Sequence, residues 1–429
     1  MTTPNRREFL AGAAALAITG PASAVSPNDR FTVGVIGCGG MGTSHAKTLA
    51  ARKDVAIAYV CDPDDKRSAA AAKAVAAIAG NAPATERDLR KVLDDKSVDA
   101  VWVATCDHWH APAAILAVDA GKHVYVEKPC SHNLREGRLM IDAARRNKKV
   151  MQVGTQRRSS DFAQSGIKAL RDGAIGEVLV AKVWNSQLRR NIGKAKADQP
   201  PANLDYDLWV GPAPMKPFQP NLLHYNWHWF YDFGTGDIGN DGVHQIDVAR
   251  WGLGVEGLPT RVSAMGGKYF FDDDQEFPDT MVVSFEYGTG AGRPKMLVYE
   301  QRIWSPYAQE GEENGDVFYG TKGMMTLGRS GWQIFGERNE PGPSAKGSIS
   351  LPPHHSNFLD CIKSGAMPNA DIAVNHPSSA LCHLGNIASR LGRNLRLDPV
   401  KEEVVGDDEA TRLLRRTYRD GHWAAPKGV

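Results

Sequence analysis

The sequence predicts an α/β protein whose first third forms a doubly wound parallel sheet of the kind that binds nucleotides. Three observations support this prediction. A G-x-G-x-x-G stretch follows a strand-like run, strand-like and helix-like segments alternate, and polar residues stand where the strand-like runs end. With 429 residues, the chain is long enough for two domains.

The glycine-rich stretch lies between residues 31–36, which have the pattern of a buried strand, and residues 43–51, which have the pattern of a helix. The first glycine permits a tight turn, the second lets the backbone approach a pyrophosphate, and the third lets the helix pack against the strand. The phosphates would then face the free N–H groups of the helix N-terminus. The predicted cofactor-binding loop comprises Gly37, Gly39, Gly40, Met41 and Gly42.

An acid ends the next strand-like run, "VAIAYVCDPD", at Asp62. A carboxylate at this place can accept hydrogen bonds from the ribose hydroxyls of NAD and would repel a 2′-phosphate. Lys66 and Arg67 follow closely and weaken that argument. The sequence therefore favours NAD as the cofactor and leaves NADP as the alternative.

Two further runs, "VDAVWVAT" and "KHVYVEKP", are predicted to be buried strands separated by a helix over residues 111–120. Connections of this kind give a right-handed parallel sheet, in which ligands bind beyond the carboxyl ends of the strands. The residues predicted to line the cofactor at these ends are Thr105, Asp107, His110, Glu127 and Lys128.

The second of these runs ends in a charged pair followed by Pro129. The proline fixes its own φ and restricts Lys128 to extended conformations, which would aim the amine. A polar pair belongs at the exit of a buried strand when that exit borders a binding cleft. The alternative is a surface ion pair at a strand end.

A second group of polar residues lies in "GTGDIGNDGVHQIDVARW", where a glycine-rich loop becomes a helix. His244, Asp247, Val248 and Trp251 share one face of that helix. His244 can project into a cleft while the apolar residues anchor the helix. The alternative is that His244 is a satisfied core histidine and that Asp247 only bonds its neighbours.

Together these motifs resemble the glucose–fructose oxidoreductase, inositol dehydrogenase and MocA family. Further matching stretches are "QVGTQRRS", "LDYDLWVGPAP" and "LCHLGNIASRLGRNL", and the resemblance covers roughly residues 30–399. It implies a Rossmann domain, a C-terminal α/β domain with an open, largely antiparallel sheet, and an active site between them. We expect an export signal and linker over residues 1–28, the Rossmann domain over 29–152 and the substrate and oligomerisation domain over 153–429.

The resemblance also implies roles for two residues. Lys128 would contact both nicotinamide and substrate, and His244 would be the general base. In the oxidation of a secondary alcohol, NAD accepts the hydride, His244 can take the hydroxyl proton and Lys128 can stabilise negative charge on the oxygen. In several exported relatives the cofactor is held tightly and recycled in place, and members commonly form homo-oligomers.

The sequence departs from the family pattern at one position. Well-studied members carry an aspartate four residues before the histidine, where this chain has Asn240. An amide can hold a sugar hydroxyl but cannot accept a proton. Asp237 and Asp241 are nearby in sequence, although a shift of one residue would turn either side chain in another direction.

The predicted substrate-binding residues combine rings, amides and charges, because aromatic faces stack on sugar C–H surfaces and polar groups hydrogen-bond to hydroxyls. A carbohydrate or polyol is therefore the expected substrate class. The alternative for any tryptophan is core packing, which we expect for Trp229 and Trp251. The predicted substrate residues are Gln156, Arg157, Trp184, Asn185, Tyr225, Trp227, Asp237 and Asn240, with Arg158 and His228 as further candidates.

Composition excludes other function classes. The formal net charge of +2 does not indicate a nucleic-acid partner. The six cysteines have neither zinc-like spacing nor the density of a disulfide scaffold. His354 and His355 are adjacent but lack acids or cysteines at ligand spacing, so no metal site is expected.

The N-terminus, "NRREFLAGAAALAITGPASA", places Arg6 and Arg7 before an apolar run too short to span a bilayer and ends in a small-residue cleavage pattern. It resembles a twin-arginine signal, which predicts the twin-arginine translocase as a partner during export and a periplasmic or otherwise exported protein. The alternatives are an ordinary secretory signal or a cytoplasmic tail. No other stretch has membrane length.

These observations predict an exported NAD(P)-dependent oxidoreductase that acts on a sugar, a sugar derivative or a polyol. One alternative keeps the cofactor but uses transient oxidation to cleave glycosidic bonds. Another is a non-catalytic nucleotide-binding sensor, against which the presence of Lys128 and His244 argues.

Overall fold

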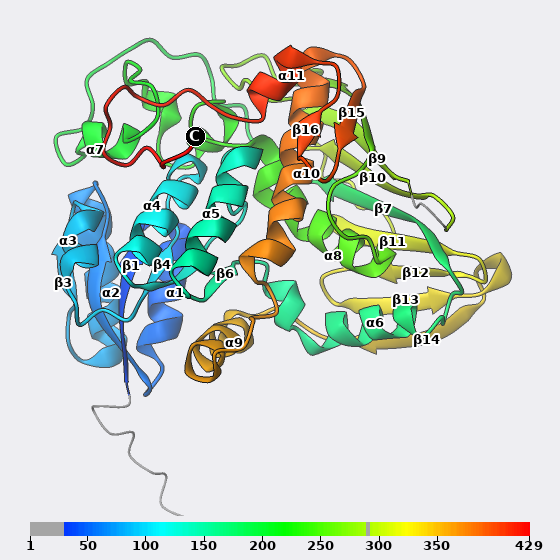
Figure 1. Cartoon of the computed structure of the whole chain (residues 1–429), viewed down its shortest axis with the longest axis horizontal. Coiled ribbons are helices and arrows are strands. Elements are labelled where there is room, and N and C mark those ends of the chain that lie inside the picture. The colour runs from blue at the N-terminus through cyan, green and yellow to red at the C-terminus, as the bar shows by residue number, and fades with distance from the viewer. Residues whose placement is uncertain (1–29, 289–291) are drawn as a thin grey trace, which may run out of the picture.

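A computed structural model of the chain describes residues 30–288 and 292–429, which form two sheets side by side with helices around them (Figure 1). The predicted export signal lies outside these residues. Within them, no helix has both the length and the apolar character that a membrane span requires.

The first sheet has six parallel strands in the order β3-β2-β1-β4-β5-β6. The order reverses direction at β1, whose neighbours are β2 and β4, and this switch opens a crevice at the carboxyl ends of the strands. The strands are β1 Phe31–Ile36, β2 Val55–Cys61, β3 Ala84–Glu86, β4 Ala100–Val103, β5 His123–Val126 and β6 Met151–Val153.

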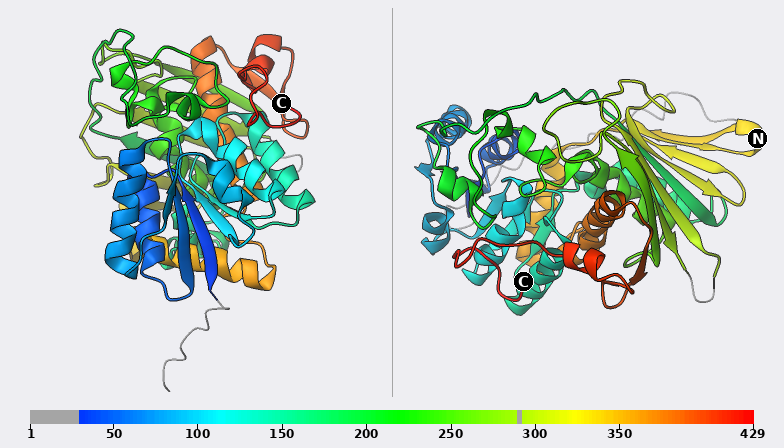
Figure 2. Two further views of the ribbon diagram at one scale, coloured as in Figure 1. Left: turned by 90° about the vertical axis from the view of Figure 1, so that its left-hand side faces the viewer. Right: turned by 90° about the horizontal axis from the view of Figure 1, so that it is seen from above.

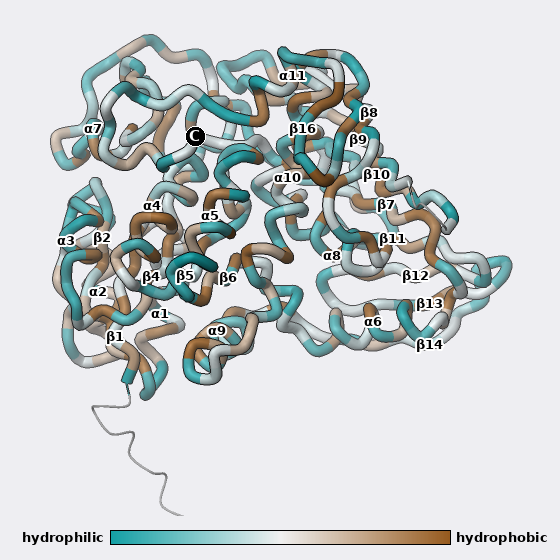
Figure 3. The backbone as a smooth tube through the Cα atoms, viewed as in Figure 1, coloured by the Kyte–Doolittle hydropathy of each residue, from teal (hydrophilic) through white to brown (hydrophobic). Residues whose placement is uncertain are grey.

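Five helices follow the strands of this sheet: α1 Gly40–Ala50, α2 Asp65–Ala79, α3 Leu89–Asp94, α4 Asp107–Asp119 and α5 Leu134–Arg146. Nearly every residue of α4 is buried, and much of its tube is brown in Figure 3. The sequence predicts this helix only over residues 111–120, whereas the structure starts it at Asp107. In the structure α4 continues past Pro112, and Arg416 Nη2 donates to the His108 carbonyl oxygen that the proline cannot bond (2.7 Å).

The chain returns to the first sheet late in the sequence. Helix α9, Leu351–Ser364, lies below this sheet in Figure 1 and buries Phe358 and Leu359 against the residues of β1, β2 and α1. Residues far beyond the predicted boundary at 152 therefore contribute to the core around the Rossmann sheet. The boundary itself stays a prediction.

The second sheet has ten strands in the order β14-β13-β12-β11-β7-β10-β9-β8-β15-β16. Among the strands of residues 30–288 and 292–429, only β7 and β10 of this sheet pair in parallel, so the predicted open and largely antiparallel sheet is confirmed. The strands are β7 Val178–Ser186, β8 Arg261–Gly267, β9 Thr280–Tyr287, β10 Lys295–Arg302, β11 Asn314–Gly320, β12 Met324–Leu327, β13 Gly331–Phe335, β14 Pro341–Lys346, β15 Leu395–Asp398 and β16 Glu403–Val404.

Helices cover one face of this sheet, as the right-hand view of Figure 2 shows. They are α6 Asp161–Arg171, α8 Val243–Leu253 and α10 Ile372–Leu391, with α11 Asp408–Leu413 near the end of the chain. Their apolar sides pack against alternate residues of the strands, such as Val283 and Phe285. The opposite face leaves large apolar side chains exposed: Met265 (77%), Val282 (48%), Met296 (39%) and Tyr319 (42%).

A long connection between the two sheets crosses the carboxyl edge of the first sheet. It contains α7 Tyr206–Val210 and the short turns η3 Pro220–Leu222 and η4 Asn226–Trp229, and it lies above the first sheet in Figure 1. We call residues 198–224 of this connection the covering segment. Further short turns are η2 Gln156–Ser159, η5 Ile238–Gly242 and η6 Glu337–Asn339.

Candidate active site

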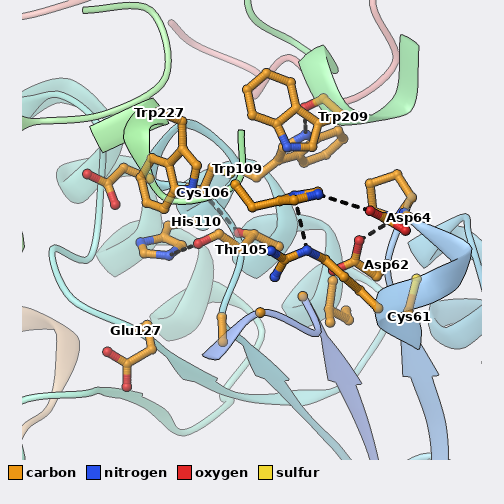
Figure 4. Close-up of a pocket in the computed structure, with 18 of the residues that line it drawn as sticks. Cys61, Asp62, Asp64, Thr105, Cys106, Trp109, His110, Glu127, Trp209 and Trp227 are labelled. Atoms are coloured by element: carbon orange, nitrogen blue, oxygen red, sulfur yellow. Dashed lines mark hydrogen bonds and ion pairs between the residues drawn. The ribbon is translucent and has the colours of Figure 1, made fainter. Parts of the chain in front are cut away.

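A cavity of about 440 Å³ lies between the carboxyl ends of the first sheet and the covering segment. In Figure 4, Asp62 and Asp64 project from the strand ends while Trp209 and Trp227 come from the opposite wall. The predicted cofactor residues all line it: Gly37, Gly39, Gly40, Met41, Asp62, Thr105, Asp107, His110, Glu127 and Lys128, with Gly42 alone excepted.

The glycine loop has the geometry that a dinucleotide requires. Gly37 has φ +90°, and a Cβ there would lie 2.4 Å from Ala104 O. A Cβ on Gly42 would lie 1.8 Å from Gly37 O, so the close packing of α1 on β1 requires glycine at this position. A Cβ on Gly39 would meet only the tip of Arg67, and α1 begins at Gly40. The space before the helix N-terminus is thus open for a pyrophosphate.

Asp62 is tied to the glycine loop. Its Oδ2 accepts from the Cys38 backbone N–H (2.7 Å) and its Oδ1 from that of Asp64 (2.9 Å). Burial raises the pKa of Asp62, although these bonds and the Arg67 cation oppose the shift. The carboxylate therefore fixes the loop and still lines the cavity where a ribose would lie.

The covering segment is bonded to the strand ends beneath it. The backbone N–H of Asp65 donates to Asn203 O (3.0 Å), and that of Asp205 donates to Pro63 O (2.9 Å). The Asn203 side chain donates to Asp64 Oδ1 (2.7 Å). The cavity is thus roofed by backbone and side-chain bonds on the side of the predicted ribose.

A second link crosses the cavity beside the glycine loop. Arg67 Nε donates to His224 Nδ1 (3.0 Å), and His224 Nε2 lies 3.2 Å from Asp64 Oδ2. These contacts fit a neutral ring that carries its proton on Nε2, and burial together with Arg67 lowers the pKa of His224. Arg67 therefore stands at the edge of the predicted pyrophosphate site, held by the covering segment.

Three predicted residues form the floor of the cavity between β4 and α4. His110 Nδ1 lies 2.7 Å from Pro129 O, and its Nε2 lies 3.2 Å from Thr105 O. Asp107 accepts from Thr235 Oγ1 (2.6 Å), and burial raises the pKa of this carboxyl group. His110 thus braces the loop that presents Lys128.

Glu127 is buried at the end of β5 and is joined to a chain of rings. Its Oε1 lies 2.9 Å from His45 Nε2, and His45 Nδ1 lies 2.8 Å from His355 Nε2. Burial alone would raise the pKa of Glu127, but the bond to His45 and the nearby cations lower it to about 2. The carboxylate is therefore ionised and fixed, since Gln156 Nε2 also approaches it (3.4 Å).

Lys128 joins the first sheet to the loop before α8. Its Nζ donates to Asn240 O (2.8 Å) and to Asn240 Oδ1 (3.3 Å). The Asn240 amide in turn donates to Tyr225 OH (3.0 Å) and to Asp237 Oδ1 (3.3 Å). Lys128, Asn240 and Tyr225 all line the cavity, so the structure brings three predicted residues from three segments together.

Asp237 and Asp241 share one arginine that sequence reasoning missed. Arg189 Nη2 donates to Asp237 Oδ1 (2.9 Å) and also pairs with Asp241. Burial raises the pKa of Asp237. Burial also opposes ionisation of Asp241, yet Arg189, Lys128 and His244 hold its pKa below the usual value. Residues 238–242 form a π-helical turn, whose wider spacing lets both acids reach the same guanidinium.

His244 lies at the start of α8 within the electrostatic reach of Lys128, Asp241 and Glu127. Burial, with the Lys128 cation second, lowers its pKa to about 4, and Asp241 partly opposes the shift. Among the described residues the ring makes no hydrogen bond, and His244 is not one of the residues that line the cavity. It is therefore neutral at pH 7 and is not the satisfied core histidine of the alternative interpretation.

Asp247 has the structural role of the alternative interpretation, in which it only bonds its neighbours. Its carboxylate accepts two bonds from Arg158 (2.7 and 2.8 Å) and one from Ser378 (2.7 Å). Arg158 is thereby held in a buried position beside α8, which packs on the second sheet. Trp229 is buried, as expected, and Trp251 packs against the core.

Strand alternation separates two residues that the sequence places in one site. Asn185 and Trp184 are neighbours in β7, so their side chains point to opposite faces. Asn185 Nδ2 donates to Asp237 Oδ2 (2.8 Å) on the helix-covered side. Trp184 is buried on the other face, where its Nε1 donates to Glu312 O (2.9 Å), and it does not line the cavity.

Of the remaining predicted substrate residues, Trp227 lines the cavity and Arg157 does not. Trp227 lines the cavity with its ring stacked 3.6 Å (between centroids) from that of His228. Arg157 is buried further back, where it pairs with Asp316 (3.4 Å). Its pKa is lowered by burial, which Asp316 opposes. Arg157 thus lies behind the cavity wall, within reach of His244 only through its charge.

No metal site emerges from the described part of the chain, where no three histidine, cysteine or acidic side chains are arranged to hold an ion. His354 bonds Ser159 (2.7 Å) and Val153 O (2.9 Å), and His355 bonds His45. All six cysteines are free.

The arrangement can bind a dinucleotide and move a proton beside it. The glycine loop, Asp62 and the roof of the covering segment fit the adenosine and pyrophosphate portions. The ammonium group of Lys128 lies at the other end, and the neutral ring of His244 is within electrostatic reach of it. Such a pair can hold an alcohol oxygen and accept its proton.

Comparisons with known proteins agree with this geometry. Residues 31–155 match the family model described as an oxidoreductase family NAD-binding Rossmann fold. Residues 183–278 and 346–425 match that of the C-terminal alpha/beta domain of the same oxidoreductase family.

Individual relatives match only part of this chain, at about one third sequence identity. Inositol 2-dehydrogenase 2 of Saccharopolyspora erythraea is 33% identical over 53% of this chain and 55% of its own length. A glycosyl hydrolase family 109 protein of the same organism is 32% identical over 36% of this chain and 35% of its own length. The chain thus spans about half, or less, of the length of these curated relatives.

Among solved structures, levoglucosan dehydrogenase in complex with NADH and levoglucosan has a TM-score of 0.65 and 19% identity, covering 86% of this chain and all of that one (100%). This likeness concerns the fold. Because the two family models together match most of the sequence, the chain belongs to the glucose–fructose oxidoreductase, inositol dehydrogenase and MocA oxidoreductase family.

Proposed function

We propose that this protein is an NAD-dependent dehydrogenase that transfers hydride between the nicotinamide ring and a CH–OH carbon of a sugar, a sugar derivative or a polyol. The observation that carries the proposal is the meeting of Lys128 with the loop before α8, which places its ammonium group at the cofactor cavity and within electrostatic reach of His244. The inositol and levoglucosan dehydrogenases among its relatives support the substrate class.

The chain's own residues provide the proton chemistry. Lys128 would donate to the substrate oxygen and stabilise its negative charge, which requires exchange of its bond to Asn240 for one to substrate. His244 is neutral at pH 7 and would accept the hydroxyl proton. When bound, NAD supplies the hydride acceptor.

The polar residues around Lys128 suit a hydroxyl-rich ligand. Tyr225 and Trp227 present rings at the cavity, and Asn240 presents an amide between Lys128 and Asp237. Arg189 bridges the two acids that would otherwise repel each other. A sugar ring with neighbouring hydroxyls fits this combination of ring faces and paired donors and acceptors.

NAD is the proposed cofactor, held tightly and recycled in place. Asp62 at the predicted ribose position favours NAD over NADP, since it would repel a 2′-phosphate. The covering segment lies over the cavity with bonds to Asp64, Asp65 and Pro63. Release of the dinucleotide would require some of those bonds to open.

Mass spectrometry of the nucleotide that copurifies with the protein tests the cofactor assignment. Adding a panel of sugars and polyols to the loaded protein and following the absorbance of the reduced ring tests the reaction. We expect stoichiometric NAD(H) and reduction of bound NAD by at least one polyhydroxylated substrate. Stoichiometric NAD with no reduction across the panel would contradict the proposal and favour a non-catalytic sensor.

A second candidate function is cleavage of a glycosidic bond through transient oxidation, with the cofactor restored in each turnover. The similarity to a glycosyl hydrolase family 109 protein favours it, as does a roofed cofactor site. Cleavage of a chromogenic glycoside without net NADH would support this candidate. Net accumulation of NADH from a free sugar would support the dehydrogenase.

We also propose that the protein is exported by the twin-arginine translocase to the periplasm or beyond. The support is the Arg6-Arg7 pair, the apolar run and the small-residue cleavage pattern. Cell fractionation of the full chain and of an Arg6→Lys/Arg7→Lys variant tests it. We expect the variant to stay in the cytoplasm, and equal export of both would contradict this route.

Homo-oligomerisation through the open face of the second sheet is the remaining proposal. Met265, Val282, Met296 and Tyr319 are exposed there on neighbouring strands. An apolar face of this kind favours burial against another copy. Sedimentation of the wild type and of a Val282→Glu variant tests it, with dissociation of the variant as the expected result.

A further inference from the structure

A second cavity, of about 660 Å³, lies apart from the cofactor site and has a different chemistry. It is bounded by the start of α5, the last turns of α10 and the chain that follows α11, which meet near the top of Figure 1. Five cationic and two acidic side chains line it. The cations are Lys216, Arg390, Arg412, Arg415 and Arg416, and the acids are Asp232 and Glu276.

Both acids are already engaged. Asp232 pairs with Lys216, and Glu276 accepts a hydrogen bond from the backbone N–H of Tyr231. Within the described residues, the side chains of Arg412 and Arg415 have no ion pair or hydrogen bond. Arg390 only stacks over the Tyr231 ring, 4.3 Å from its centroid. The cavity therefore has an excess of positive charge that the protein does not neutralise.

Arg416 adds buried donors without partners. Its side chain is only 9% exposed. Nη2 donates to Glu136 Oε1 (2.7 Å) and His108 O (2.7 Å), whereas Nε and Nη1 have no partner in the structure. A buried donor that lacks a partner is costly, so such groups usually bond a ligand or water.

Two histidine rings complete the lining. The ring nitrogens of His132 and Nε2 of His383 are buried and have no hydrogen-bond partner in the described part of the chain. Burial lowers the pKa of both rings, which are therefore neutral near pH 7 and can donate or accept without adding charge. The cavity thus offers two kinds of donor to an anion: charged guanidinium groups and neutral ring N–H groups.

From these contacts we propose that this cavity binds a small organic polyanion, a molecule carrying two or more carboxylate or phosphate groups. Guanidinium forks match both groups in bidentate geometry. Three guanidinium groups have no acidic partner among the described residues: those of Arg390 on α10, Arg412 on α11 and Arg415 just after it. Together they can engage more than one carboxylate or phosphate group. The cavity volume also exceeds that of a single oxyanion. The neighbouring Thr235 hydroxyl bonds Asp107 of the cofactor cavity, so the two sites share a wall.

Calorimetric titration of the NAD-saturated protein tests the proposal, because saturation with NAD blocks the pyrophosphate site of the cofactor cavity. Citrate and inorganic pyrophosphate are the probes, each at constant ionic strength, and their relative affinities distinguish a carboxylate ligand from a phosphate ligand. We expect saturable binding of at least one probe with one site per chain.

The variant Arg390→Gln/Arg415→Gln, with both single substitutions measured beside it, removes two exposed guanidinium groups of the cavity. We expect it to weaken probe binding about tenfold or more. Arg396→Gln/Lys346→Gln is the matched control, since it removes two exposed cations elsewhere, and we expect a change below about twofold. Absence of saturable binding, equal weakening in both double variants, or release of NAD by the probe would overturn the proposal. Its failure would leave the proposed dehydrogenase activity unaffected.

Discussion

The Nζ atom of Lys128 lies 2.8 Å from the backbone carbonyl oxygen of Asn240, although 112 residues separate them in the chain. This bond joins the exit of β5 in the first sheet to the turn that precedes α8 against the second sheet. It positions the ammonium group at the cofactor cavity and close enough to His244 to lower the pKa of that ring. The proposed chemistry depends on this meeting of two segments.

Two substitutions in the glycine loop separate the effect of close packing at one glycine from the effect of replacing any glycine of the loop. Gly42→Ala would place a Cβ 1.8 Å from Gly37 O, whereas a Cβ on Gly40 meets nothing within 4 Å. We expect Gly42→Ala to lower the melting temperature by several degrees and to reduce NAD content, because α1 must move away from β1. Thermal melts and nucleotide content of both variants check this. Equal melting temperatures for Gly42→Ala and the Gly40→Ala control would contradict the packing argument.

Asn240→Asp restores the residue that well-studied relatives carry, yet we expect it to destabilise this chain. The Asn240 amide donates to Tyr225 OH and to Asp237 Oδ1 (3.3 Å); a carboxylate cannot donate, so it would lose the bond to Asp237, face a second acid and require the Tyr225 hydroxyl to turn. The loss of buried bonds corresponds to about 1–3 kcal/mol of unfolding free energy. Denaturant unfolding measures it, with Asn394→Asp at an exposed position as the control. Unchanged stability would show that the surrounding acids rearrange freely.

Retention of the cofactor is expected to depend on the link between Arg67 and His224. Arg67→Ala removes this bond (3.0 Å) and leaves the other bonds of the covering segment intact. We expect NADH release to accelerate about tenfold, as the loss of one hydrogen bond with a charged donor implies. Stopped-flow fluorescence of bound NADH measures the rate. Lys73→Ala, an exposed cation on the same helix, is the control, and equal rates in the two variants would contradict a role for the link.

Stability is expected to fall as the pH drops from about 6.5 towards 4. In the folded protein, burial lowers the pKa of His244, His123 and His354 to about 4. Between this value and the ordinary histidine pKa near 6.5, the unfolded chain binds more protons than the folded one, so acid favours unfolding. Glu127, with a pKa of about 2, contributes at lower pH only. Thermal melts between pH 4 and 8 check this, and a flat profile would contradict these depressed values.

Much of the fold is readable from the sequence because its signals are local. The glycine loop, the alternation of elements and the acid after β2 lie within short stretches, and the structure places them in the predicted sheet. The start of α4 is not readable in the same way. Its first turns carry Pro112, and the carbonyl group this residue leaves free is bonded by Arg416 from the end of the chain.

The candidate site shows where local signals fail. Trp184 and Asn185 both have side chains typical of a sugar site, but strand alternation sends them to opposite faces, and that follows only once residues 178–186 are known to be a strand. Arg189 belongs to no motif that the sequence shows. Its importance comes from Asp237 and Asp241, which a π-helical turn directs to the same guanidinium.

The most direct test of the account is the rate of hydride transfer in a single turnover of the NAD-loaded protein, wild type against His244→Ala. General base assistance by a positioned side chain contributes about 10²- to 10⁴-fold, so we expect a loss on that scale while the bound NAD stays stoichiometric. Transfer by His244→Ala within a few-fold of the wild-type rate, with cofactor still bound, would contradict the assignment of His244 as the base.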